Sequence, residues 1–164
     1  MHMPHQTVLD AIGNTPLVDV EGVYAKLESV NPSGSIKDRV ALEIITAAEK
    51  EGLLKPGYRI VEASSGNTGI SLSMIAAVKG YQMIIVMPEN MSRERQLMMK
   101  AFGAELVLTS KSGSLQEAID KAEELSKEPK TFYTKQFSNP NNMMAHIKTG
   151  QEIVDEIGAV DAVV

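Results

Sequence analysis

The chain has 164 residues, 43% of them hydrophobic and 23% charged, and a formal net charge of −5. This composition is typical of one globular domain, or one domain and the start of another, and argues against a disordered chain. The acidic balance and the lack of a basic run argue against nucleic acid as a partner. The absence of cysteine excludes disulfides, thiolate metal ligands and a cysteine nucleophile, and we expect no metal site.

The apolar segments are too short to cross a membrane. The most apolar one spans residues 83–88, whereas a transmembrane helix needs about 20 residues. Residues 1–8 lack the apolar core and the small-residue cleavage site of a signal peptide. The sequence therefore predicts a soluble, cytoplasmic protein that does not bind a membrane.

Beyond residue 22, short β-branched runs alternate with longer stretches of helical period. Strands are predicted at residues 23–27, 59–62, 83–87, 105–108, 132–134 and 160–164, and helices at residues 36–51, 68–79, 93–102, 114–127 and 142–157. The fourth helix has the clearest pattern, because its apolar residues between Leu115 and Leu125 share one stripe. Glycines stand at predicted helix ends, as left-handed caps do, at Gly52, Gly80, Gly103 and Gly158.

This alternation predicts an α/β fold with a doubly wound, mostly parallel sheet and helices on both faces. In such folds ligands bind beyond the carboxyl ends of the strands, so the loops that follow the strands are the ones to search. The last predicted strand, at residues 160–164, is apolar and has nothing after it. We therefore expect the chain to be part of a longer protein.

The first loop of interest spans residues 31–39 and leads into the first predicted helix. Its Asn-Pro and Ser-Gly steps predict a turn, and Ser35 with Asp38 has the spacing of a capping box. Lys37 would then lie in the first helical turn, where the helix dipole disfavours the ammonium form. Schiff-base chemistry needs a neutral lysine. The alternative is a solvated lysine in a well-capped helix.

A second loop, residues 62–69, follows a predicted strand and opens the second helix. Its backbone N–H groups and its hydroxyls would surround an anion, and Gly66 and Gly69 would permit close approach of the backbone. The spacing matches neither a dinucleotide-binding motif nor a P-loop. The alternative is an ordinary turn capped by serine or threonine.

A third loop, residues 136–142, is rich in side-chain amides and lies between a predicted strand and the last helix. Amides of this kind suit hydrogen bonding to a small polar ligand. The alternative is a turn closed by its own asparagine side chains.

Taken in order, these three loops resemble those of cysteine synthase (O-acetylserine sulfhydrylase) and of the related cystathionine β-synthases. The resemblance begins at residues 12–18 and continues through residues 24–28, 87–95 and 103–105, so it covers almost the whole chain. Several unrelated short strings in the family order form a specific signal, whereas each string alone is weak.

The resemblance implies a fold-type II pyridoxal-phosphate enzyme that makes cysteine from an O-activated serine and sulfide. Lys37 would hold pyridoxal 5'-phosphate and later move protons at the substrate α-carbon, and Asn67 would hydrogen-bond the ring oxygen of the cofactor. The substrate carboxylate would bind to Ser64, Ser65, Gly66, Asn67, Thr68 and Gln136. The resemblance also implies a homodimer that acts on a small amino acid and has serine acetyltransferase as a partner.

By the same resemblance, residues 1–164 are the N-terminal part of a truncated two-domain enzyme. Residues from about 40 to 145 would form a smaller mobile domain, and the flanking segments would belong to a larger domain whose remainder is absent. The family's phosphate-binding loop would follow Val164, and the serine that faces the pyridine nitrogen would come later. The family has threonine where Ser64 stands, and both residues carry a hydroxyl. Residues 18–24 are shorter than in the family, which suggests a trimmed hairpin and a changed dimer contact.

Two alternatives stay within this fold, namely cystathionine synthesis and serine or threonine dehydration. A third alternative, of another class, is a non-catalytic fragment or interaction module. The sequence does not identify the activated serine or the sulfur donor.

Overall fold

The protein is described by a computed structural model that covers residues 7–112 and 114–163. At its centre lies a four-stranded sheet formed by β3 (Arg59–Ala63), β4 (Gln82–Pro88), β5 (Glu105–Thr109) and β6 (Thr131–Tyr133). The strands follow the order β5-β4-β3-β6, and all three pairings are parallel. The predicted parallel sheet is therefore confirmed.

The central strands form because their side chains are apolar on both faces, as in a sheet covered on both sides. In β4 every residue after Gln82 is buried, whereas the edge strands β5 and β6 keep no fully buried residue. Alternate residues of the central strands point to opposite faces, so the sheet supports two cores.

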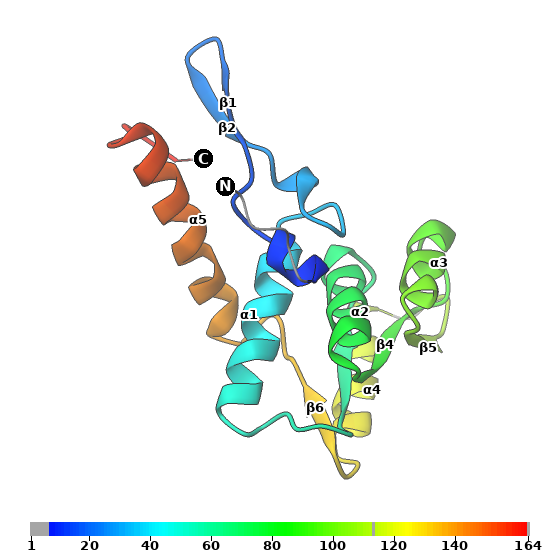
Figure 1. The fold of residues 1–164 in the computed structure, drawn as a ribbon. Helices are drawn as coiled ribbons and strands as arrows, with labels where there is room; N and C mark the ends of the chain where they lie inside the picture. Colours follow the sequence, from blue (N-terminus) through cyan, green and yellow to red (C-terminus); the bar gives the residue numbers. More distant parts are fainter. Residues whose placement is uncertain (1–6, 113, 164) are drawn as a thin grey trace.

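One face of the sheet is covered by α4 (Leu115–Ser126), whose Ala118 and Ala122 pack on Val61 and Val86. The other face is covered by α1 (Lys37–Lys50), α2 (Asn67–Lys79) and α3 (Arg93–Ala101), which form the larger core with β3 and β4. Figure 1 shows α4 on the far side of the strands from α2. The doubly wound arrangement with helices on both faces is confirmed.

The outer part of the molecule consists of residues 13–31 and α5 (Asn141–Ile157). In residues 13–31, the strands β1 (Leu17–Val20) and β2 (Val23–Lys26) form a separate antiparallel hairpin. A short 3₁₀ helix, η1 (Val8–Ala11), precedes the hairpin, and another, η2 (Glu28–Val30), follows it. In Figure 1 the hairpin projects beyond the sheet, and α5 runs beside α1 rather than over the strands.

Two sequence interpretations need correction. The strand β1 is missing from the strands predicted by pattern, although the family resemblance implies a hairpin here; the turn at Glu21 and Gly22, whose φ angles are 53° and 87°, pairs β1 with β2. The strand predicted at residues 160–164 is wrong over 160–163, where the backbone is irregular and Val163 is 77% exposed. None of the described strands pairs with this segment, so its backbone groups take part in no ladder of strand hydrogen bonds. Residue 164 lies outside the described residues.

All four helix-end glycines have positive φ angles, and Gly80 forms the predicted left-handed cap at the end of α2. The left-handed cap predicted at Gly158 is wrong, because its ψ of −142° lies outside that region. None of the helices in residues 7–112 and 114–163 has the length and apolarity that crossing a bilayer would require.

Candidate active site

The loops that follow β3 and β6 meet at the carboxyl edge of the sheet. These strands are parallel neighbours, with Val61 opposite Tyr133. Gln136 is buried, and its Nε2 donates a hydrogen bond of 3.1 Å to the carbonyl oxygen of Ala63. The structure thus brings Gln136 beside the start of the serine-rich loop, where an α/β fold places ligands.

Ser64 and Ser65 connect β3 to α2. The hydroxyl oxygen of Ser64 accepts a hydrogen bond of 3.0 Å from the N–H of Gly69, so this buried serine closes the first turn of the helix. Its own hydroxyl hydrogen is left to donate elsewhere. Ser65 is half-buried, and its carbonyl oxygen accepts from the guanidinium of Arg95 at 3.5 Å.

The N-terminus of α2 keeps donors available. Asn67, the first helical residue, is exposed and Thr68 is buried, and neither backbone N–H has an acceptor among residues 7–112 and 114–163. Unpaired N–H groups at a helix start attract anions. The helix start can therefore donate to a carboxylate.

The two glycines of this loop have different surroundings. A Cβ on Gly66 would meet nothing within 4 Å, so the space beside the helix start is open. A Cβ on Gly69 would lie 2.7 Å from Cε of Met99 and 3.3 Å from the carbonyl oxygen of Ser64. Packing of α2 against α3 and its own loop is thus a second reason for a glycine at position 69, whereas close approach of the backbone to a ligand stays a prediction for both glycines.

Glu62 connects the loop that follows β3 to the loop that follows β6 through hydrogen bonds. Its carboxylate accepts from the N–H of Ala63 at 2.9 Å, from the N–H of Gln136 at 3.1 Å and from the hydroxyl of Thr134. The residue is 1% exposed. Burial raises the pKa of Glu62, although the hydrogen bonds oppose the shift. Sequence reasoning did not single out Glu62; the available signal was a charged residue inside an otherwise apolar strand.

Lys37 begins α1, as predicted, but its cap differs from the prediction. The hydroxyl of Ser35 accepts from the backbone N–H of Lys37 at 3.2 Å. The carboxylate of Asp38 does not reach back to Ser35; it accepts from the N–H of Ser33 at 2.7 Å and from the Ser33 hydroxyl. The capping box between Ser35 and Asp38 is therefore wrong, because a turn closed by Gly34 N–H and Asn31 O folds Ser33 over the helix start.

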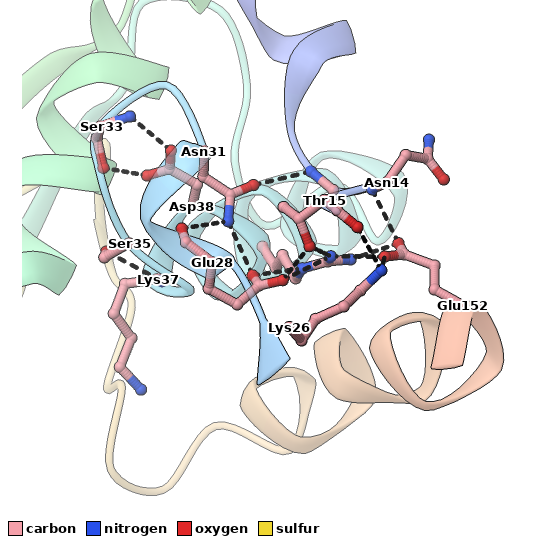
Figure 2. Close-up of polar contacts among 12 residues, drawn as sticks. Asn14, Thr15, Lys26, Glu28, Asn31, Ser33, Ser35, Lys37, Asp38 and Glu152 are labelled. Carbon is pink, nitrogen blue, oxygen red and sulfur yellow. Dashed lines mark hydrogen bonds and ion pairs between the residues drawn. The ribbon is translucent and has the colours of Figure 1, made fainter. Parts of the chain in front are cut away.

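The loop before Lys37 is tied to α2 as well. The hydroxyl oxygens of Ser33 and Ser71 lie 3.0 Å apart. Lys37 itself is half-buried, and no described residue hydrogen-bonds or ion-pairs with its Nζ. Figure 2 shows its side chain extending away from Lys26 and Glu152. An amine without a protein partner fits a lysine that bonds a cofactor carbonyl.

His146 on α5 lies within electrostatic reach of Lys37. Burial lowers the pKa of His146, and the charges of Lys37 and Arg39 lower it further. The structure places this histidine in α5, which corresponds to the helix predicted at residues 142–157.

An α/β fold with a lysine at one helix start, open N–H donors at another and a buried glutamine between two loops is an arrangement that can bind an anionic ligand. Residues 8–164 match the family model described as pyridoxal-phosphate dependent enzyme, and the chain belongs to this family. Membership implies pyridoxal 5'-phosphate as the cofactor, and the amine of Lys37, which has no partner among the described residues, fits the carbonyl group of that cofactor.

The chain is similar to several proteins named cysteine synthase. It is 48% identical over 163 residues to one from Flavobacterium sp., covering 94% of this chain and 53% of that protein. It is 48% identical over 161 residues to cysteine synthase B from Escherichia coli, covering 93% and 53%. The crystal structure of cysteine synthase from Entamoeba histolytica superposes with a TM-score of 0.93 at 44% identity, covering 97% and 52%. The chain thus spans about half the length of these relatives.

Proposed function

We propose that the whole protein makes L-cysteine from an O-activated L-serine, O-acetylserine, and sulfide. The observation that carries the proposal is identity of 48% to a cysteine synthase along nearly the whole chain. In the net reaction the C–O bond at the β-carbon breaks, acetate leaves, and sulfide forms the new C–S bond. Pyridoxal phosphate, when bound, supplies an electron sink for this chemistry.

In this proposal the residues at the start of α1 and those at the start of α2 have different roles. Lys37 holds the cofactor through its Nζ and moves the proton of the substrate α-carbon. The side chain of Asn67 donates to the ring oxygen of the cofactor. The substrate carboxylate is bound by Ser64, Ser65, Gly66, Asn67, Thr68 and Gln136. Three features support this set, namely the open N–H donors of α2, the open space beside Gly66 and the side chain of Gln136 at the same edge.

The domain division is part of the same proposal. Residues from about 40 to 145 form a smaller mobile domain, and the flanking segments belong to a larger domain of the whole protein. In support, the sheet and most of its covering helices fall within this range, whereas the hairpin and most of α5 fall outside it and lie apart from the strands (Figure 1).

We also propose a homodimer, with the hairpin as one contact. Cross-strand pairing puts Val18, Val20 and Val23 on one face, and their exposed fractions are 38%, 57% and 70%. An apolar face of this kind marks an interaction surface. The cytoplasmic location is carried over from the sequence prediction, and serine acetyltransferase as a partner rests on the family resemblance. Light scattering of the chain at several concentrations tests the dimer, and a monomer throughout would contradict it.

The reaction is tested by giving the whole protein O-acetylserine with sulfide and measuring cysteine. Homocysteine in place of sulfide tests cystathionine synthesis, and serine or threonine alone tests dehydration through release of the keto acid. Cysteine formation at the highest rate supports the proposal. A preference for homocysteine or a keto-acid product would replace it with the corresponding alternative, and no product in any assay would favour an interaction module.

A further inference from the structure

Arg39, two residues after Lys37, lies between two carboxylates. Its guanidinium donates to Glu28 at 2.8 and 2.9 Å and to Glu152 at 2.6 and 2.7 Å. Each carboxylate is thus bound by a bidentate pair, the strongest geometry for an arginine. Only 5% of the Arg39 side chain is exposed.

The charges around Arg39 balance. We define the Arg39 cluster as Thr15, Lys26, Glu28, Arg39 and Glu152, which are joined by hydrogen bonds and ion pairs. Lys26 Nζ lies 3.0 Å from Glu152 and donates to the carbonyl oxygen of Thr15 at 2.6 Å. Two cations therefore face two carboxylates, and a buried ion group holds together best when every charge is paired.

The electrostatics of the two carboxylates agree with this balance. Hydrogen bonds from Arg39 are the main reason that the pKa of Glu152 is lowered to about 2. Burial by itself would raise the pKa of Glu28, but hydrogen bonds from Arg39, Thr15 and Asn31 outweigh it and hold the pKa below its ordinary value.

The cluster joins residues between Thr15 and Arg39 to Glu152 on α5, which lies 113 residues after Arg39. Figure 2 shows Glu28 following the hairpin, Glu152 on α5 and the segment around Asn14 converging on one point. The N–H of Asn14 donates to Glu152 at 3.0 Å, and the N–H of Gly13 donates to Asn31 at 2.9 Å. The loop that precedes Lys37 is therefore fixed to the same cluster through Asn31.

Lys37 and Arg39 share the first turn of α1 but face opposite sides. At 3.6 residues per turn, two positions differ by about 200° around a helix. Arg39 can thus hold the helix on the side of the cluster, while the side chain of Lys37 extends away from Lys26 and Glu152 (Figure 2). We propose that Arg39 is a positioning residue: through its pairs with Glu28 and Glu152, it fixes the start of α1 and with it the direction of Lys37. This inference rests on the proposed role of Lys37.

The test compares Arg39→Met, which keeps length and loses charge, with Arg39→Lys, which keeps charge but not the two bidentate pairs. Each 164-residue chain is incubated with pyridoxal phosphate and reduced with borohydride, and the labelled lysine is mapped by mass spectrometry. Amide exchange of residues 36–42 is measured without cofactor. In Arg39→Met we expect labelling of Lys37 to fall several-fold, and exchange at the helix start to rise about tenfold or more.

The matched control is Arg59→Met, because Arg59 is also ion-paired, to Glu128, but lies at the far end of the sheet. It should leave Lys37 labelling and exchange at residues 36–42 unchanged. Arg39→Lys should recover part of the labelling, which a loss of packing alone would not predict. If Arg39→Met does not fold, Glu152→Gln replaces it, since it removes the same pair from α5 and should give the same two changes.

The outcomes separate the inference from the proposed function. Unchanged Lys37 labelling and unchanged exchange in the folded Arg39→Met or Glu152→Gln chain would overturn the inference. If the unaltered chain shows no labelling at Lys37, the labelling is repeated on the whole protein. No label at Lys37 there removes the cofactor role, and the exchange arm alone then decides whether Arg39 fixes the helix start.

Discussion

The sheet region and the outer part of the molecule are held by different forces. In the sheet region many large apolar side chains are fully buried, as at Leu72 and Ile85. In the outer part many large apolar side chains are exposed, such as Met143 at 71%, and the Arg39 cluster links its segments to α1. The comparison shows that the residues of the proposed site are supported partly by the sheet region and partly by the outer part. The substrate loops rest on packing, whereas Lys37 stands next to a group of charges.

The largest effect should come from removing packing in the sheet. Ile85→Ala empties a position that is 0% exposed, and such changes cost about 2–5 kcal/mol in the free energy of unfolding. Ile147→Ala is the matched control, because this side chain on α5 is 58% exposed and should cost about 0.5 kcal/mol or less. Denaturant titrations of both chains measure the difference, and equal losses would show that the outer part is packed as tightly as the sheet.

A smaller loss should follow Glu62→Gln, which cannot accept all the hydrogen bonds that the carboxylate accepts. A buried donor left without an acceptor costs about 1–3 kcal/mol. We also expect faster amide exchange at Gln136, because its N–H bonds to Glu62. Glu105→Gln, on an exposed position of β5, is the control and should change neither quantity. If exchange at Gln136 stays slow, Glu62 does not tie the two loops together.

Lowering the pH should have opposite effects on the contributions of Glu152 and Glu62 to stability. The pKa of Glu152 is lowered to about 2 from 4.5, so its contribution to stability is present above pH 4.5 and is lost as the pH falls towards 2. The pKa of Glu62 is raised, so its contribution is present below pH 4.5 and is lost as the pH rises through the folded-state value. Amide exchange measured from pH 5 to 2 should therefore rise first around α5, after correction for intrinsic rates. The Glu152→Gln chain should lack much of this rise, and the same rise in that chain would assign it to another group.

The smallest effect should come from an exposed ion pair. Lys121 and Glu124 pair at 2.8 Å on the outer surface of α4 with exposed fractions of 38% and 66%. Lys121→Ala should change the free energy of unfolding by about 0.5 kcal/mol or less, because solvent screens such pairs. A loss of unfolding free energy comparable to that of Arg39→Met would mean that burial does not determine how much an ion pair contributes to the stability of this protein.

Much of the fold was predictable because it follows from local patterns. The apolar run of β4 and the stripe of α4 specify their elements within a few residues of the chain. The strand at residues 160–164 was predicted wrongly for the same reason: an apolar run indicates a strand only where a neighbouring strand offers hydrogen bonds.

The site was predictable only in part. The loops at residues 64–68 and 136 could be placed together, since parallel strands bring their carboxyl ends to one edge. Arg39 and Glu152 are 113 residues apart in the sequence, and no spacing pattern predicts their contact. The packing role of Gly69 depends likewise on Met99, which lies in another helix. Contacts between distant segments are decided by the assembled fold.

The distance in sequence between Arg39 and its partner on α5 has a consequence for the order of folding. Strands and helices up to residue 134 can assemble while later residues are still being synthesised, since domains fold from the N-terminal end as the chain emerges. The pair of Arg39 with Glu152 must close a loop of more than a hundred residues. Closing such a loop costs chain entropy, so this contact forms slowly. The helix start that carries Lys37 would therefore reach its final form among the last events of folding, after the binding loops have formed.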